Sequence, residues 1–331
     1  RAAFLEEPMG IILAMQGAAA QGVLWGIMTL GVYITFKILD FADLTVDGSF
    51  ALGGAVSAVL IVHGINPYIS LAIAFLAGAA AGYVTGFLHT KLKIPGILAG
   101  ILTMIALYSI NIRIMGQANT PLLGVGTMLS APAAWFGMSK TVGSLAIGAL
   151  FSAIIIVSMY WFFGTELGSS VRATGNNERM VRALGVNTNS MKNIGIMLSN
   201  ALVSLSGAMV AQSQGYADVG MGTGTIVIGL ASIIIGEVIF GKRFSFWYLL
   251  TSVVLGSVIY RIIIAVVLQL GLKSTDLKLL TAVIVAFALA LPVVRGDLRK
   301  RKNRRLNRQL YAGDAAATAA ATSAGGEGGQ K

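Results

Sequence analysis

Nine long apolar segments dominate this sequence. They cover residues 10–36, 44–63, 67–88, 96–115, 142–163, 191–214, 224–240, 246–270 and 277–294. A helix needs about 20 mostly apolar residues to cross a bilayer, and only helices and closed barrels satisfy their backbone groups inside lipid. Barrel strands alternate polar and apolar residues and seldom contain such runs. The segments therefore predict an all-α polytopic membrane bundle of about nine spans, with eight or ten as the alternatives.

The composition agrees with a lipid environment. Hydrophobic residues make up 56% of the chain and charged residues 11%, against about 45–50% and roughly 25% in ordinary soluble domains. This balance excludes a soluble enzyme and a disordered protein. The chain contains no cysteine, so it cannot form a disulfide framework, a zinc finger or a thiol nucleophile.

The basic residues predict the orientation of the bundle. Residues 295–308 hold eight Arg or Lys and one Asp. Directly after an apolar segment, such a run favours a cytoplasmic flank that contacts anionic lipid over a nucleic-acid site. With this flank inside and nine spans threaded backwards, seventeen basic residues fall in inside segments and five in outside segments. Because cytoplasmic segments are enriched in Lys and Arg, we expect the N-terminus outside and the C-terminus inside.

Composition divides the chain into four parts. Residues 1–9 are expected to be an N-terminal leader before the first apolar segment, and they show no signal-peptide pattern. Residues 10–294 form the membrane domain, which includes a polar cytoplasmic loop at 164–192. Residues 295–310 form a basic cytoplasmic segment, and residues 311–331 are an Ala/Gly/Thr-rich tail that we expect to be disordered.

Glycine spacing predicts close packing in one span and a break in another. Gly78, Gly82 and Gly86 lie four residues apart on one face of the third span, and small residues at that spacing let helix backbones approach closely. Glycine also occupies every second position from Gly220 to Gly224, at the start of the short seventh span. This pattern predicts a broken or half-spanning helix of the kind that lines cavities in transporters.

One segment is similar to a phosphate-binding P-loop. It runs from Gly236 to Lys242, but the next residue is Arg243, where a P-loop needs Ser or Thr to hold Mg²⁺. The segment also ends an apolar helix instead of following a strand. We therefore expect no nucleotide site in this chain and interpret Lys242 and Arg243 as cytoplasmic charges.

The polar loop before the sixth span contains a short predicted helix. The helix covers residues 178–184, with Asn176 or Asn177 as its N-cap and Glu178 in its first turn, where the helix dipole favours an anion. Gly185 can end it in a left-handed conformation.

An apolar stripe on this short helix suggests that it docks against a partner. Met180, Val181 and Leu184 share one face, whereas Arg179 and Arg182 point elsewhere. A helix this short is not stable alone in water. It is expected either to lie on lipid headgroups or to bind a cytoplasmic protein.

Four segments, in chain order, resemble the permease subunits of ABC importers, closest to the branched-chain amino acid and ribose permeases. They are DFADLTVDGSFALGGA at 40–55, KLKIPGILAGILTM at 91–104, RATGNNERMVRALGVNTNSMK at 172–192 with the apolar span after it, and GTGTIVIGLASIIIGEVIFGKR at 222–243. The resemblance covers about residues 15–295. The DLTVDGSF variant is most similar to a subgroup paired with binding lipoproteins for aromatic or related amino acids.

This resemblance implies a transport complex in the bacterial cytoplasmic membrane. Two permease subunits would form the pore, and a homodimer is expected over a heterodimer. Two cytoplasmic ATPases would carry ATP and Mg²⁺, and an extracytoplasmic lipoprotein would deliver the solute. The coupling contact with the ATPase would be made by Asn177, Glu178, Arg179, Met180, Val181, Arg182, Leu184 and Gly185.

Polar residues within the spans have more than one interpretation. Asp43 is expected to cap the second span, Glu237 to pair with Lys242 or Arg243, and Arg261 to serve either an ion pair or the pore. Hydrogen bonds between helices explain the polar patch of the sixth span as well as a pore lining does. The candidates for the translocation path are Asp47, Ser49, Phe50, Asn200 and Ser204.

The sequence thus favours a non-catalytic permease subunit that imports a small polar solute, with an amino acid as the first expectation. We expect no metal site and no cofactor in the chain itself. A sugar or nucleoside permease is one alternative. A secondary transporter driven by an ion gradient is another, but it would need buried ion-binding carboxylates and inverted repeats. A purely structural membrane protein is disfavoured by the broken seventh span.

Overall fold

The computed structural model describes residues 3–128, 140–241, 245–271, 276, 279–287 and 290. In this part of the chain eight helices are long and apolar enough to cross a membrane. They cover Ala14–Ile38, Thr45–Val62, Pro67–Thr90, Gly96–Met115, Thr141–Gly164, Thr188–Gln214, Val219–Phe240 and Phe246–Gln269. The helical polytopic bundle predicted from the sequence is therefore confirmed.

Several predicted boundaries differ from the observed ones. Helix α1 (Ala3–Tyr33) is continuous through the predicted leader and runs into a π-helix, η1 (Ile34–Ile38). Most of the ninth predicted span lies in the described range 279–287 and position 290, which is helical. The basic segment and the Ala-rich tail, residues 295–331, lie outside the described residues.

The elements follow one another with short connections. After η1 come α2 (Thr45–Val62), α3 (Pro67–Thr90), α4 (Gly96–Met115), β1 (Asn119–Pro121), α6 (Lys140–Gly164), α7 (Glu166–Asn176), α8 (Glu178–Ala183), α9 (Thr188–Gln214), β2 (Tyr216–Asp218), the 3₁₀-helix η2 (Val219–Gly222), α10 (Thr225–Phe240) and α11 (Phe246–Gln269). The chain divides into two compact units, Arg1–Val285 and Ala286–Lys331, and all of these elements belong to the first.

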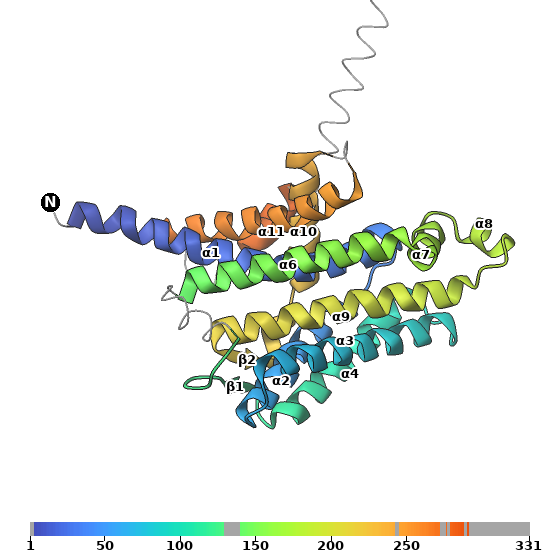
Figure 1. Ribbon diagram of the computed structural model, residues 1–331, viewed down its shortest axis with the longest axis horizontal. Helices are drawn as coiled ribbons and strands as arrows, with labels where there is room; N and C mark the ends of the chain where they lie inside the picture. The colour runs from blue at the N-terminus through green and yellow to red at the C-terminus, as the bar shows by residue number, and fades with distance from the viewer. Residues whose placement is uncertain are drawn as a thin grey trace, which may run out of the picture. The chain divides into compact units, whose positions relative to one another are not determined.

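Helix α9 lies in the middle of the first unit, packed against α1, α2 and α3 (Figure 1). Its contact with α3 confirms the packing predicted from the glycine stripe. A Cβ atom placed on Gly82 would lie 2.6 Å from the carbonyl oxygen of Ile196, and Gly78 faces Asn200 and Ser204 as closely. Glycine is therefore required where these two backbones meet, because any larger residue would push α3 away from α9.

The two ends of the bundle differ in structure. At one end β1 and β2 pair antiparallel, with Thr120 opposite Ala217, so the chain segments after α4 and α9 lie together. The helices α7 and α8 lie at the opposite end (Figure 1). This arrangement places the 164–192 loop on the opposite side of the bundle from the strand pair.

Helix α10 is the broken span that the glycines predicted. It follows the 3₁₀-helix η2 and a residue in the left-handed region, Gly224, with φ of +83°. The helix proper has 16 residues, which corresponds to about 24 Å at 1.5 Å per residue. That is shorter than the hydrocarbon core of about 30 Å, whereas Val219–Phe240, which includes η2, has 22 residues and is long enough to cross it.

Candidate functional site

The 164–192 loop folds into two short helices. The first helix, α7, was not predicted from the sequence. Thr165 caps it by accepting a hydrogen bond from the Gly168 N–H at 3.3 Å. Asn177 caps α8, since its Oδ1 accepts from the Met180 N–H at 3.1 Å. Gly185 ends the segment with φ of +85°. The cap and the end predicted for the short helix are thus confirmed, with Asn177 as the cap.

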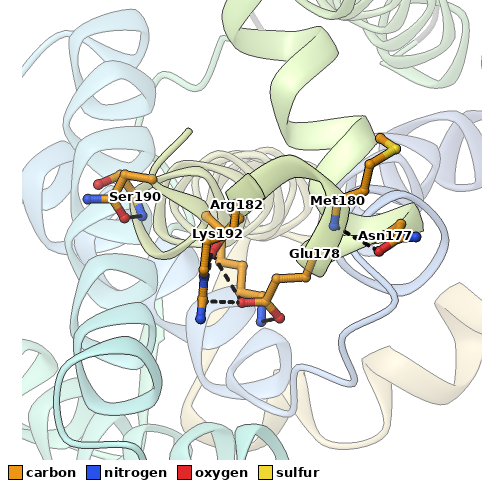
Figure 2. Close-up of polar contacts among 8 residues, drawn as sticks. Asn177, Glu178, Met180, Arg182, Ser190 and Lys192 are labelled. Carbon is orange, nitrogen blue, oxygen red and sulfur yellow. Dashed lines mark hydrogen bonds and ion pairs between the residues drawn. The ribbon is translucent and has the colours of Figure 1, made fainter. Parts of the chain in front are cut away.

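Glu178 ties α8 to the start of α9 (Figure 2). Its carboxylate accepts from Lys192 Nζ at 2.7 Å and from Arg182 Nη2 at 2.8 Å. The Thr188 hydroxyl donates to Glu178 Oε1 at 3.1 Å and accepts from Arg182 Nη2 at 2.9 Å. Arg182, which the resemblance assigns to the coupling contact, forms its hydrogen bonds within this cluster.

These contacts shift the acidity of Glu178. The hydrogen bond from Lys192, followed by the attraction of Lys192 and Arg182, holds the pKa of Glu178 below its ordinary value despite partial burial. A carboxyl group with a lowered pKa in the folded state stabilises that state above its unfolded pKa. The contribution is lost as the pH falls through the lowered folded pKa.

Glu178→Gln should therefore loosen α8 at neutral pH. We expect its backbone amides to exchange about two- to fivefold faster, because a partly exposed ion pair contributes about 0.5–1 kcal/mol. Hydrogen-exchange mass spectrometry, corrected for intrinsic rates, should show the difference from wild type shrinking below the ordinary glutamate pKa of about 4.3. Lys192→Met is the matched control, and its effect should not add to that of Glu178→Gln. A pH-independent difference would contradict this role of the charge.

The apolar stripe of α8 is divided between the inside and the outside of the molecule. Val181 is 2% exposed, whereas Met180 is 49% and Leu184 is 74% exposed. Arg179 is also exposed. Val181 therefore anchors the helix on its own chain. Arg179, Met180 and Leu184 lie on the surface that α8 presents, together with Arg182 and Ala183.

Most of the predicted path residues lie inside the packed bundle. Ser49, Phe50, Asn200 and Ser204 are all fully buried. The Asn200 amide donates from Nδ2 to Asp43 Oδ2 at 2.7 Å, and its Oδ1 accepts from the Ser49 hydroxyl at 2.7 Å. These hydrogen bonds connect α9 to α2 and to Asp43 just before α2. The path role of these residues stays a prediction.

Phe50 and Ser204 also make internal contacts. The Phe50 ring lies 4.9 Å from the Trp25 ring between centroids, and the Ser204 hydroxyl donates to the Ala74 carbonyl at 2.6 Å. Both side chains therefore join helices of the same subunit.

Asp47 has a role that its position in the sequence does not reveal. Its carboxylate accepts from the Gly224 N–H at 2.9 Å, the Thr225 hydroxyl at 2.8 Å and the Ile226 N–H at 3.0 Å. It therefore caps the N-terminus of α10, a helix that begins 178 positions later. The first backbone amides of a helix have no partner within it, so this carboxylate stabilises the break.

The other charged residues of the spans also differ in part from expectation. The Asp43 carboxylate accepts from the Thr45 N–H at 2.9 Å and also from Asn200. The N-cap position of α2 is Leu44, so Asp43 lies one residue before the predicted cap position. Glu237 forms an ion pair with Lys37 at 3.2 Å, whereas its predicted partners at 242 and 243 lie outside the described residues. The Arg261 guanidinium lies over the Trp25 ring, 3.9 Å from its centroid.

Comparison with known proteins assigns this architecture to a family. A model described as "Branched-chain amino acid transport system / permease component" matches residues 14–293. The chain belongs to this permease family. The tyrosine transport system permease protein of Clostridioides difficile is 43% identical over 88% of this chain and 94% of its own length. An uncharacterized protein of Rickettsia prowazekii, RP368, is 33% identical over 82% of this chain and 94% of its own length. The ribose import permease protein RbsC of Escherichia coli is 29% identical over 53% of this chain and 54% of its own length.

Membership establishes what kind of protein this is. The chain is a permease subunit of an ABC importer, a transport component in the bacterial inner membrane that works with an ATPase and a binding protein. Within the described residues no group of three or more His, Cys, Asp or Glu side chains could hold a metal ion.

Proposed function

We propose that this permease imports an aromatic amino acid, with L-tyrosine as the first candidate. The observation that carries the proposal is the 43% identity to a tyrosine transport system permease along nearly the whole of both chains. The likeness to a ribose permease is weaker and covers about half of each chain. A sugar is therefore the second candidate.

The proposal assigns α8 to coupling with the ATPase. Its exposed Met180 and Leu184 offer apolar contacts, and Arg179 offers a positive charge to an acidic rim. Asn177, Glu178, Arg182 and Gly185 would keep the helix in place. ATP and Mg²⁺ would bind the ATPase, whose movement would reach the bundle through the ion pair between Glu178 of α8 and Lys192 of α9.

The proposed complex contains two copies of this permease, two ATPases and one extracytoplasmic lipoprotein. The α8 end of the bundle would face the cytoplasm, and the β1–β2 end would receive the lipoprotein. This orientation is supported by the bias of basic residues toward the inside segments. The basic run at 295–308 would contact anionic lipid, because polybasic segments beside a membrane are attracted to it.

Uptake into proteoliposomes tests the solute and the energy source together. The permease is reconstituted with its ATPase and binding protein, and radiolabelled L-tyrosine and ribose are supplied in parallel. We expect tyrosine uptake that requires ATP and is competed by phenylalanine but not by ribose. Ribose uptake would favour the sugar alternative. Tyrosine uptake driven by an ion gradient without the ATPase would contradict the proposal.

A further inference from the structure

A cavity of about 290 Å³ lies between α2, α4 and the η2 break, within the first unit of the chain. Its wall is mostly apolar, with a few polar groups, as in sites for small molecules. The lining residues that matter here are Asp47, Met104, Ile105, Tyr108, Asn111 and Thr223. The cavity adjoins the break before α10, and discontinuous helices line the solute sites of transporters.

Asn111 lines this cavity and has a hydrogen-bond acceptor without a partner among the described residues. Its side chain is 1% exposed, and its Nδ2 donates to the Gly48 carbonyl at 3.4 Å. That contact sets the orientation of the amide group. Its Oδ1 is buried and has no partner among the described residues. A buried acceptor without a donor is unfavourable, so this atom fits a ligand that supplies an N–H or O–H.

Asp47 brings negative charge to the same cavity. Its three hydrogen bonds come from Gly224, the N-cap of α10, and from the first turn of that helix. No Lys, Arg or His in the described part of the chain forms an ion pair with it. A helix N-terminus offsets only about half an elementary charge. A carboxylate can accept about four hydrogen bonds, which leaves one for a ligand.

We propose that this cavity binds the ammonium group of the transported solute. An ammonium group has three donors and one positive charge, so it satisfies Asn111 Oδ1 and compensates the charge of Asp47. A sugar hydroxyl would donate a hydrogen bond to Asn111 Oδ1 but would leave the negative charge of Asp47 uncompensated. The apolar wall of Met104, Ile105 and Tyr108 would face the solute's side chain. The inference rests on the proposed function, since it takes the solute to be an amino acid.

Thiol protection in the assembled importer tests the site directly. Ile105→Cys places a single thiol on the cavity wall of a permease without native cysteines, and a water-soluble maleimide reports its accessibility. The probes are L-tyrosine, tyramine, which lacks the carboxylate, and 3-(4-hydroxyphenyl)propionate, which lacks the ammonium group. We expect the first two to slow labelling and the third to have no effect.

The role of the Asn111 amide is tested by adding Asn111→Leu to the Ile105→Cys permease. The tyramine concentration that gives half-protection should rise about tenfold, as expected for loss of a hydrogen bond to a charged group. Thr103→Val on the same helix is the matched control, because its hydroxyl is buried but bonds to Thr85 and Ala99. It should shift half-protection less than about twofold.

Three outcomes would overturn the inference. The first is protection by the propionate alone, and the second is protection by tyramine that Asn111→Leu leaves unchanged. The third is a thiol that does not react with the maleimide or that no probe protects, as expected if a second copy of the permease or a lipid acyl chain fills the cavity. If tyrosine uptake is normal and protection is absent, the inference fails while the proposed function stands. If tyrosine is not transported but tyramine protects through Asn111, the solute assignment fails while the ammonium site stands.

Discussion

Leu184→Glu should abolish the association of the permease with its ATPase. Leu184 is 74% exposed at the end of α8, so its apolar surface is available to a partner. Burying a leucine side chain contributes about 1.5–3 kcal/mol, and Leu184→Ala should weaken docking about tenfold or more. Glutamate adds the cost of removing a charge from water in an apolar contact. Copurification from detergent and ATP-driven uptake measure the loss.

A matched control separates docking from damage to the fold. Leu123 is 87% exposed and follows β1, at the opposite end of the bundle from α8 (Figure 1). Leu123→Glu introduces the same charge at a similarly exposed leucine and should leave ATPase copurification at the wild-type level. Both variants should keep the thermal stability of the wild-type permease, because neither side chain lies in the core.

One result would remove α8 from the coupling role. If Leu184→Glu copurifies the ATPase in wild-type yield and retains solute-stimulated hydrolysis, this surface does not hold the ATPase. The helix would then be assigned to the lipid headgroups, where exposed Met180 and Leu184 could insert and Arg179 could meet phosphate.

Asn200→Leu should destabilise the subunit strongly without redirecting its solute preference. The change removes the donor to Asp43 and the acceptor of Ser49, both of which lie in the buried interior. A hydrogen bond to a charged group contributes about 1.5–3 kcal/mol, and an unpaired buried hydroxyl adds a further cost of about 1 kcal/mol or more. We therefore expect a loss of roughly 3 kcal/mol, measured as a lower midpoint of thermal unfolding in detergent.

Two further variants test the cause of this loss. Ser204→Ala removes a hydroxyl that bonds only to the Ala74 carbonyl among the described contacts, and it should cost about 1 kcal/mol. Adding Ser49→Ala to Asn200→Leu should recover part of the loss, because both partners of one bond are then absent. Unchanged stability together with an altered KM for uptake would return Asn200 to the translocation path.

Features that depend on neighbours in the chain were predictable from the sequence. The span Gly96–Met115 has the predicted ends, because a run of apolar residues between polar ones determines where a helix can sit in lipid. The cap at Asn177 and the left-handed Gly185 follow from local hydrogen bonding and backbone sterics. Glycine spacing likewise indicated close packing of α3 at Gly82, but only the structure shows that the neighbour there is α9.

Only the tertiary structure decided which polar side chains hold helices together and which line a cavity. Asn200 meets Asp43 across 157 positions, Asp47 caps a helix that begins 178 positions later, and Lys37 pairs with Glu237 across 200. A polar residue in a span must find a partner or a wet surface. Which of these it finds depends on how its helix is rotated against the neighbouring helices. That rotation is set by packing between distant segments, so hydropathy and spacing along the chain do not contain it.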